Sequence, residues 1–366
     1  MTTSGRLLFV DGLRGVAALM VVAFHFHENI APAVQAWLPS LATQLFLHGN
    51  LGVEVFFVLS GFVIAQSISA GERSLRYLGR FGLRRSIRLD PPLWVTILLE
   101  CMLISLTLVV APSRTAVLPS WSQLLANVTY TQHFLGYKDI VPVFWSLTFE
   151  VQFYVVAVSA LIARRALDIG RIPGALIFCA AFTYSLSIWL ELVRAPLPGL
   201  FIDRWFQFSL GVAAWLVCRQ MIPATAALLG GASILALVSV SGAPVYRLQS
   251  TIACLVTAAT MIAVGRSGRM GSLLDGKVIQ FFGKISYSLY LVHLLVGWRL
   301  ITLSRIALGP EFGPLLGTAI FLAAVISSVA AAWLMYLLVE RPSIRFARRI
   351  SLPLNAQLER SASVVR

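Results

Sequence analysis

An arginine and a histidine stand eleven positions apart in an otherwise apolar stretch, VDGLRGVAALMVVAFHFHEN, residues 10 to 29. In a helix, eleven residues make three full turns plus about 20°, so Arg14 and His25 share one face. The two side chains are then separated by ~16 Å along the helix axis. Asp11, three residues before Arg14, lies on the same face and can hold its guanidinium. The spacing therefore predicts two polar groups that address one interior space from different depths.

The residue types indicate what this pair could do. A guanidinium grips an anionic head group, and a neutral imidazole can remove a proton from a substrate. Arg14 toward the cytoplasm and His25 in the outer half of a membrane span would then hold a long substrate in a tunnel between them. The alternative is an arginine that reaches the membrane interface and a histidine hydrogen-bonded to a neighbouring helix. The shared face favours the functional interpretation, whereas His27 points away from it.

Other reactive or charged side chains gather in five short stretches of the chain. These stretches read GVEVFFVLSGFVI (52–64), RRSIRLDPPLW (84–94), VFWSLTFEVQFY (143–154), GKISYSLYLVHLLVGW (283–298) and VERP (339–342). In the last of them, Glu340 is expected to pair with a loop arginine. The side chains in the other four that could act on a substrate are Glu54, Ser60, Arg85, Arg88, Trp145, Ser146, Glu150, Tyr287 and His293.

Several of these side chains have more than one interpretation. Arg85 and Arg88 have the planar fork that matches phosphate geometry, although basic residues at that place also fit the ordinary charge bias of cytoplasmic loops. Glu150 could pair with a protonated histidine or orient a neutral one. It could equally occupy a helix N-terminus, where negative charge is favourable. Trp145 could stack on a sugar ring or anchor its helix at the membrane interface.

Composition identifies the setting in which these residues act. The chain has 366 residues, of which 58% are hydrophobic and 12% charged, and its mean hydropathy is +0.84. Soluble domains carry about a quarter charged residues, so a polytopic membrane protein is expected. A span takes roughly 20 apolar residues and must be helical, so we predict an all-α membrane protein with about ten transmembrane helices around a central cavity. The predicted spans are 7–28, 50–70, 91–112, 142–163, 173–193, 203–221, 224–242, 248–266, 281–303 and 315–339.

The basic residues predict the orientation in the membrane. With a cytoplasmic N-terminus, 22 of the 29 Lys and Arg residues fall on the inside, as the positive-inside rule requires. An even number of spans returns the C-terminus to the same side, so we expect a multi-pass protein of the plasma (inner) membrane with both termini cytoplasmic. The net charge of +14 then reflects topology and contact with the anionic lipid of the bilayer. No nucleic-acid-binding face is indicated.

One membrane domain, residues 1–342, is expected, followed by a basic cytoplasmic tail, residues 343–366, that is partly disordered. An Ala-Pro-Ala pattern at 31–33 resembles a signal-peptidase site, but Asp11 and Arg14 interrupt the preceding apolar stretch and favour an uncleaved first helix. The four cysteines lie singly inside predicted spans and suit neither a metal site nor a disulfide framework. The sequence gives no indication of the oligomeric state.

Taken in order, the stretches resemble the acyltransferase 3 family of integral-membrane O-acyltransferases. The matching elements are DGLRG…H, GVEVFFVLSGF, RRSIR…PPLW, WSLTFE, ISYSLYLVH and VERP, which run from residue 11 to residue 342. The resemblance implies transfer of an acyl group, usually acetyl, from cytoplasmic acyl-CoA to a hydroxyl of an envelope or exported carbohydrate. It also implies that His25 is the catalytic histidine and that Arg14, Arg85 and Arg88 hold the donor's phosphates.

Two positions depart from the family pattern. Val151 follows Glu150 where the family often has a second glutamate, which puts in doubt any role for a second carboxylate. Asp90 precedes the two prolines where the family commonly has a tyrosine or an apolar residue. Its carboxylate could weaken the local attraction for phosphate or tie down Arg88.

The resemblance and the residues together predict one mechanism. Acetyl-CoA is the donor substrate, and no metal is expected. Neutral His25, oriented by Glu150 or a nearby hydroxyl, removes the proton of the acceptor's hydroxyl, and an acetyl-histidine intermediate is a second route. The candidates for contacting the acceptor or donating to the oxyanion are Glu54, Ser60, Trp145, Ser146 and Tyr287.

Two other classes of function fit the same residues. A secondary transporter of an anionic sugar or lipid-linked glycan would use the intramembrane Arg, His and Glu for binding or proton coupling. A structural subunit of a polysaccharide assembly would bind no acetyl-CoA. The acceptor and the identity of the acyl group also stay open, with specificity expected in the outer segments 29–50 and 113–141.

Overall fold

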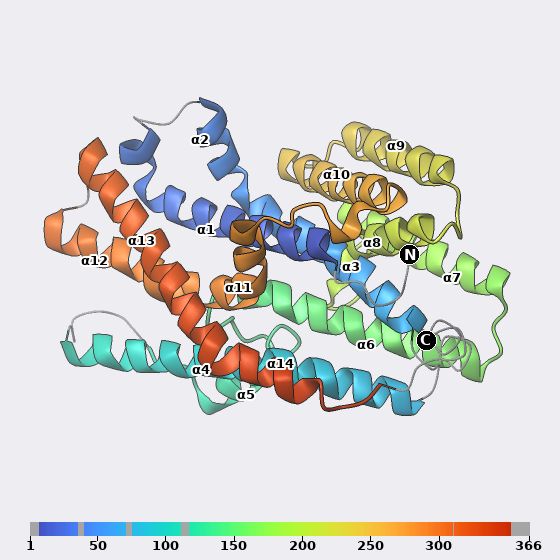
Figure 1. The fold of residues 1–366 in the computed structure, drawn as a ribbon, viewed down its shortest axis with the longest axis horizontal. Helices are drawn as coiled ribbons and strands as arrows, with labels where there is room; N and C mark the ends of the chain where they lie inside the picture. Colours follow the sequence, from blue (N-terminus) through green and yellow to red (C-terminus); the bar gives the residue numbers. More distant parts are fainter. Residues whose placement is uncertain (1–6, 36–39, 71–74, 111–116, 310, 353–366) are drawn as a thin grey trace.

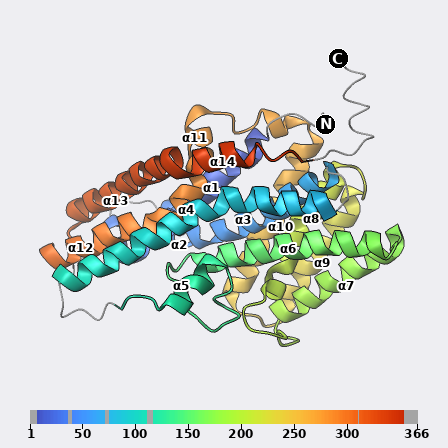
Figure 2. The same cartoon turned by 90° about the horizontal axis from the view of Figure 1, so that it is seen from below.

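The computed structural model describes residues 7–35, 40–70, 75–110, 117–309 and 311–352. Within these ranges the regular elements are helices (Figures 1 and 2), which confirms the all-α prediction. Two π-helical turns, Leu294–Trp298 and Tyr336–Glu340, interrupt the last long helices. The α-helices are α1 (Leu8–Gln35), α2 (Ser40–Leu47), α3 (Gly52–Ala70), α4 (Leu75–Val110), α5 (Trp121–Val128), α6 (Phe144–Ala166), α7 (Arg171–Trp189), α8 (Trp205–Cys218), α9 (Ala224–Val240), α10 (Val245–Arg266), α11 (Lys277–His293), α12 (Arg299–Leu308), α13 (Pro314–Met335) and α14 (Arg341–Ala347).

Eight helical segments of the described residues are long and apolar enough to cross a membrane, fewer than the ten predicted. Each of the ten predicted stretches contains helix, but in two of them the helix is too short to count. The stretch at 203–221 contains α8, which has 14 residues, and the stretch at 224–242 contains α9, which has 17. At 1.5 Å per residue α8 is only ~21 Å long, short of the ~30 Å hydrocarbon core. A 3₁₀ turn, Phe201–Arg204, precedes α8, and α8 ends at Cys218, before the predicted end of the stretch.

α1 lies in the middle of the helix arrangement (Figure 1). It packs against α11, α13 and α3, and α11 and α13 also pack against each other. A second group forms around α8, which packs against α3, α7 and α10. The two groups meet at α3, which contributes Phe57 and Ile64 to one hydrophobic core and Leu59 and Phe62 to the other. Buried side chains therefore fix α1 and its polar residues from several sides.

The crossing of α3 and α8 is close enough to require glycine on both helices. A Cβ at Gly61 would overlap the carbonyl oxygen of Phe208, and a Cβ at Gly211 would overlap the carbonyl oxygen of Val58. Small residues of this kind let two helix backbones approach each other in a membrane. The contact joins the two hydrophobic cores, so any separation of the helices disturbs both.

Replacing Gly61 by alanine is expected to destabilise the protein by about 1–3 kcal/mol, because the new methyl group forces the two backbones apart. The matched control is Gly230→Ala in α9, where a Cβ would meet nothing within 4 Å. There alanine should raise stability by about 0.5–1 kcal/mol through its helix propensity. Thermal unfolding of the purified protein in detergent compares the two, and equal midpoints for both variants would contradict the close crossing.

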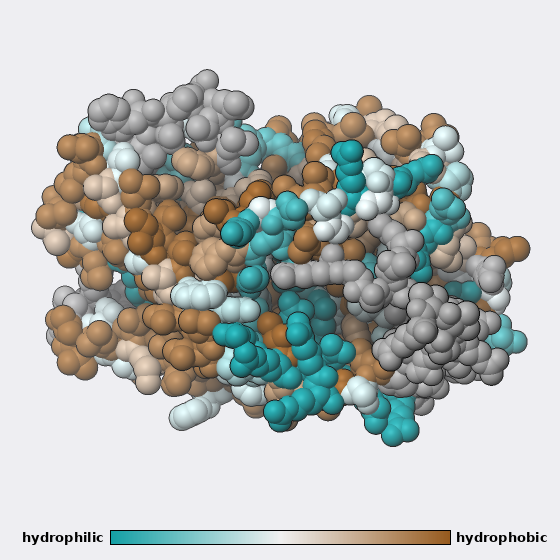
Figure 3. Space-filling view, in the orientation of Figure 1, coloured by the Kyte–Doolittle hydropathy of each residue, from teal (hydrophilic) through white to brown (hydrophobic). Residues whose placement is uncertain are grey.

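The surface divides into an apolar and a polar part (Figure 3). Hydrophobic side chains cover α12, α13 and the second half of α4, where Met102, Leu106, Leu303 and Ile326 are exposed. Hydrophilic side chains gather over α14 and the first half of α4. An apolar belt of this kind is expected of surface that faces lipid.

The boundary predicted between the membrane domain and the C-terminal tail falls inside a helix. The predicted tail, residues 343–366, begins within α14, which packs against α4. Arg80 of α4 also donates hydrogen bonds to the carbonyl and the hydroxyl oxygen of Ser351. The tail was predicted to be partly disordered, and its residues 353–366 lie outside the described residues.

Candidate active site

Three arginines from two helices meet at one buried place. Arg14 lies in α1, and Arg85 and Arg88 lie in α4, one turn apart. The charge of Arg14 acts on both other guanidiniums, so all three are close in space. The Nε atom of each is buried and has no hydrogen-bond partner among the described residues. The fold therefore brings together three guanidiniums with unused N–H donors, the three arginines that the resemblance grouped as donor-binding residues.

Carboxylates hold this cluster from the side. Oε1 of Glu150 accepts hydrogen bonds from Arg85 Nη2 at 3.1 Å and from Ser60 Oγ at 2.9 Å, and also from the hydroxyl of Tyr154. The ring of Tyr154 lies under the Arg85 guanidinium, 3.9 Å from Cζ to the ring centre. Glu340 is buried and accepts a hydrogen bond from Ser288. Glu150 thus fixes a member of the arginine cluster.

Glu340 acts electrostatically on Arg88 and Arg14, as does Asp11 on Arg88. Glu340 was expected to pair with a loop arginine, whereas the arginines it influences lie in α1 and α4. Asp11 was expected to hold Arg14. Its negative charge also acts on Arg88, across the α1–α4 boundary. The negative groups around the cluster come from three helical segments, so tertiary packing decides each pairing.

Asp90 is bound away from the cluster. Its carboxylate accepts hydrogen bonds from Ser86 and, at 2.9 Å, from the hydroxyl of Tyr130. Burial, together with the negative charge of Asp90, raises the pKa of Tyr130 above its usual value, so this phenol stays protonated and donates. Tyr287 is engaged nearby, donating to the carbonyl oxygen of Leu89 at 2.7 Å. The partners of Asp90 are thus hydroxyls, and Arg88 is not tied down by it.

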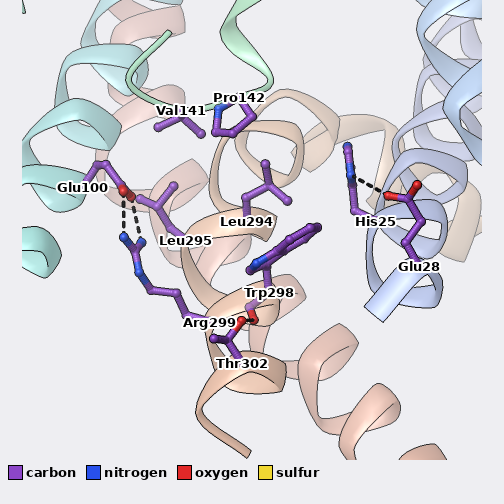
Figure 4. A pocket seen from close by; sticks show the side chains of 10 residues that line it. All are labelled: His25, Glu28, Glu100, Val141, Pro142, Leu294, Leu295, Trp298, Arg299 and Thr302. Carbon is purple, nitrogen blue, oxygen red and sulfur yellow. Dashed lines mark hydrogen bonds and ion pairs between the residues drawn. The ribbon is translucent and has the colours of Figure 1, made fainter. Parts of the chain in front are cut away.

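At the other end of α1, His25 lines a cavity of about 510 Å³ (Figure 4). His25 and Glu28 lie on one side of it, with 4.0 Å between Nδ1 and Oε2. The ring centre of His25 is 5.3 Å from that of His293 and 6.2 Å from that of Trp298. The opposite side carries Glu100 and Arg299. The cavity is thus lined by the indole of Trp298, the imidazole of His25 and the carboxylates of Glu28 and Glu100.

Comparison with known proteins agrees with this arrangement. Residues 7–337 match the model of the acyltransferase 3 family, described as an acyltransferase domain. The chain belongs to the acyltransferase 3 family. This acyltransferase is 26% identical to Acyltransferase MdmB of Streptomyces mycarofaciens, over 94% of its own length and 93% of the relative's.

Two further relatives cover most of the acyltransferase. It is 27% identical to the Putative membrane-bound transacylase BcsY of Komagataeibacter xylinus, over 93% of this chain and 83% of that one. It is 26% identical to the Exopolysaccharide production protein ExoZ of Rhizobium meliloti, over 83% and 92%. No solved structure matches the chain significantly. With its eight candidate spans, the protein is a multi-pass membrane acyltransferase.

The remaining predicted site residues of the acyltransferase lie away from the cavity. Glu54 accepts hydrogen bonds from Ser250 at 2.9 Å and from Arg204 at 3.4 Å, so it ties α3 to α10 and to the 3₁₀ turn that precedes α8. Trp145 packs edge-on against Phe57 and Phe149. Among the described residues Glu150 contacts Arg85, Ser60 and Tyr154 and not His25. The described contacts of Glu54, Trp145 and Glu150 are thus made with residues other than His25.

Ser146 has the most direct connection to the histidines. Its hydroxyl is 2.6 Å from the hydroxyl of Tyr290, and it also donates to the carbonyl oxygen of Val143. The ring of Tyr290 lies 6.0 Å from that of His293. Ser60 and Tyr287, by contrast, are held by Glu150 and by the carbonyl oxygen of Leu89. Of the predicted oxyanion candidates, Ser146 alone reaches the His25 side through described contacts.

Sequence reasoning missed four side chains that line the cavity. Glu28 could have been found, because it stands three positions after His25 on the same helix. Glu100 and Arg299 are charges inside predicted spans, a sign of buried pairing. Trp298 carried no signal beyond its aromatic ring, since the π-helical turn that directs it into the cavity has no sequence signature.

Glu100 and Arg299 form a two-pronged ion pair between α4 and α12, with N–O distances of 2.6 and 2.7 Å. Replacing Arg299 by leucine leaves the carboxylate buried without its partner and is expected to cost about 2–4 kcal/mol of stability. Replacing both residues by leucine should recover most of this loss, because no lone charge remains. Thermal unfolding in detergent measures both. A double variant less stable than the single one would contradict the pairing.

Proposed function

We propose that the protein transfers an acyl group, acetyl in the simplest case, from cytoplasmic acyl-CoA to a hydroxyl of an envelope or exported carbohydrate, with His25 as the base. The supporting observation is the division of charge along α1. Arg14 belongs to a buried cluster of guanidiniums, and His25 belongs to a cavity with carboxylates and an indole. We place the arginine end and both chain termini on the cytoplasmic side of the plasma membrane, as the basic residues favour.

Phosphate groups of the donor account for the arginine cluster. Buried N–H donors without partners are unfavourable, and three of them converge here among the described residues. Arg14, Arg85 and Arg88 together can offer parallel N–H donors to phosphate oxygens, a geometry that lysine does not provide. The flexible arm of acyl-CoA would then extend along α1 toward His25, ~16 Å away along the helix axis. The residues present fit this donor.

The reaction needs two proton transfers, one from the acceptor's hydroxyl to His25 and one from His25 to the thiolate of CoA. His25 removes the proton of the acceptor's hydroxyl, and the oxygen attacks the thioester carbonyl carbon. The carbon–sulfur bond then breaks, and the imidazolium returns the proton to the thiolate of CoA. The products are an ester and free CoA. Transfer through an acetyl-histidine would use the same imidazole as nucleophile. Ser146 is the side chain we favour for donating to the oxyanion, to which its hydroxyl would turn from the carbonyl oxygen of Val143.

The cavity beside His25 is the proposed acceptor site. Trp298 offers a flat apolar face of the kind that stacks on a sugar ring. The charges of Glu100 and Arg299 cancel, so Glu28 leaves the cavity slightly negative while His25 is neutral. Neutral sugar hydroxyls suit this environment better than uronic acids. The relative ExoZ is named an exopolysaccharide production protein, which agrees with a carbohydrate acceptor.

Radiolabelled acetyl-CoA supplied to inside-out membrane vesicles of producing cells tests the proposal. We expect label to appear in carbohydrate and to be released as acetate by mild alkali, which cleaves esters and leaves amides intact. Vesicles that lack the protein serve as the control. A transporter would move glycan without incorporating label, and a structural subunit would neither bind nor consume acetyl-CoA. Unlabelled carbohydrate in vesicles that contain folded protein would refute the assignment.

A further inference from the structure

His293 has one ring nitrogen satisfied and the other without a partner. Its Nδ1 lies 2.8 Å from the carbonyl oxygen of Tyr290 and 3.1 Å from that of Leu289. Carbonyl oxygens only accept, so Nδ1 carries the proton and Nε2 of the neutral ring carries a lone pair. Nε2 is buried and has no hydrogen-bond partner among the described residues. The main chain of α11 therefore presents a fixed acceptor that nothing described uses.

His48 provides a comparison, because it is a histidine of the same chain whose ring makes only structural hydrogen bonds. His48 makes the same bond to its own helix, with Nδ1 2.8 Å from the carbonyl oxygen of Gln44. Its other nitrogen, Nε2, lies 3.0 Å from the side-chain amide of Gln249. Both nitrogens of His48 are thus occupied. Burying a hydrogen-bond acceptor without a partner costs free energy. The unused Nε2 of His293 therefore indicates a hydrogen-bond partner that is present only at one stage of the reaction.

The position of His293 identifies that partner. Its ring lies 5.3 Å from the ring of His25, at an angle of 31° between the planes. The π-helical turn begins with the next residue, Leu294, and such turns are frequent at functional sites. Within it, Gly297 lets α11 approach so closely that a Cβ would overlap the ring of Phe26, the neighbour of His25. The two imidazoles are held together by this close approach.

We infer that His293 is a positioning residue whose Nε2 accepts a hydrogen bond from the imidazolium form of His25. The inference rests on the proposed function, in which His25 becomes positively charged after taking the proton of the acceptor. In the resting enzyme the bond need not be made, because catalytic hydrogen bonds tighten when the charge develops. His293 stays neutral throughout, and the proton passes from His25 to the departing thiolate.

Other charged groups near the pair do not replace this role. Glu28 of α1 lies 4.0 Å from Nδ1 of His25, which is beyond hydrogen-bonding distance. Glu100 of α4 is occupied by Arg299 of α12. Tyr290 of α11 shares its hydroxyl with Ser146 of α6. The described contacts of α13 at this place come from the ring of Phe321 and the hydroxyl of Ser328, neither of which is charged.

Two substitutions of His293 separate its role as hydrogen-bond acceptor at Nε2 from the hydrogen bond that its Nδ1 donates to the carbonyls of α11. In His293→Asn the amide nitrogen can keep donating to the α11 carbonyls while no acceptor remains at the Nε2 position. In His293→Gln the longer side chain can place its carbonyl oxygen near that position. We expect the turnover of acetyl-CoA to fall roughly 10- to 100-fold in the asparagine variant, the worth of a hydrogen bond to a charged group. The glutamine variant should recover part of this loss.

The pH profile provides a readout that a merely structural role would not move. Without the acceptor the imidazolium form of His25 is less stable, so protonation of the base requires a lower pH. The acid limb of the rate profile should therefore shift to lower pH in His293→Asn, with the KM for acetyl-CoA unchanged. His48→Asn is the matched control and should alter neither turnover nor the pH profile.

Labelled histidine gives an independent check on the wild-type protein. In ¹⁵N spectra of the purified chain, the signals lost in His293→Gln must show a protonated Nδ1 and an unprotonated Nε2. A protonated Nε2 would overturn the inference, as would equal turnover and acid limbs in wild type and His293→Asn. Activity retained by His25→Ala would instead refute the proposed function, so the two failures are distinguishable.

Discussion

Replacing His25 by alanine is expected to reduce acyl transfer by about 10²- to 10⁴-fold, the usual contribution of a general base. Acetyl-CoA should still bind with its native affinity, because the arginine cluster lies ~16 Å away along α1. Turnover is measured from labelled acetyl-CoA in vesicles, and binding from the rise in thermal midpoint that acetyl-CoA produces in detergent. A loss of turnover with intact binding separates the chemical step from donor recognition.

The control for this experiment lies two residues away on the same helix. His27 is buried, and its ring packs beside Phe46 rather than into the cavity. His27→Ala should lower the thermal midpoint through lost packing, while turnover per folded molecule stays near the native value. If His25→Ala transfers acetyl at the native rate, the base is another residue. If both variants lose turnover equally, α1 responds as a whole and the assignment of His25 is not specific.

Removing the two arginines of α4 should weaken donor binding strongly. In the Arg85→Ala, Arg88→Ala double variant the KM for acetyl-CoA is expected to rise about 100-fold or more. Each lost charge-assisted hydrogen bond to phosphate is worth ~1.5–3 kcal/mol. The rate at saturating donor should change much less, because His25 and its cavity are untouched. Initial rates across a range of acetyl-CoA concentrations measure both parameters.

Two companion variants make this test specific. Arg84→Ala removes a neighbouring arginine whose charge acts on Tyr77, outside the cluster. This variant should leave the KM for acetyl-CoA unchanged. Arg85→Lys keeps the charge beside Glu150 but loses the planar fork, so it should fall between wild type and alanine. A double variant that binds acetyl-CoA as tightly as wild type would place the donor phosphates elsewhere.

The helix period of the sequence predicted a good part of this site. Arg14 and His25 were placed on one face of the first helix, and the structure puts them at the arginine cluster and the cavity respectively. The resemblance joined Arg85 and Arg88 of the RRSIR stretch to Arg14 as donor-binding residues, and the three lie close together, although the stretch was placed before a span starting at 91. α4 instead runs from Leu75 through Pro91 and Pro92 without ending.

The prolines explain that difference. A proline pair commonly marks the first turn of a helix, so the span seemed to begin there. In the structure two hydroxyls donate to carbonyl oxygens next to the prolines: Thr96 of the same helix donates to Pro92, and Tyr287 of α11 donates to Leu89. The contact from Tyr287 comes from tertiary packing, which the order of residues does not reveal.

The same reason applies to the carboxylates. Glu54 was a candidate for contacting the acceptor, and Glu150 was expected to orient His25. Their partners, Arg204 and Arg85, lie 150 and 65 positions away in the chain. Local patterns identify which side chains are too polar for lipid, but the pairing depends on how the helices pack.

One consequence follows from the fact that a single helix carries both Arg14 and His25. The distance between them along the helix axis is fixed by the backbone hydrogen bonds of α1. A thinner or thicker bilayer changes the tilt of helices and slides them against one another. Contacts between α4 and α6 would be adjusted by such sliding. The distance between Arg14 and His25 would stay constant, whatever lipid surrounds the enzyme.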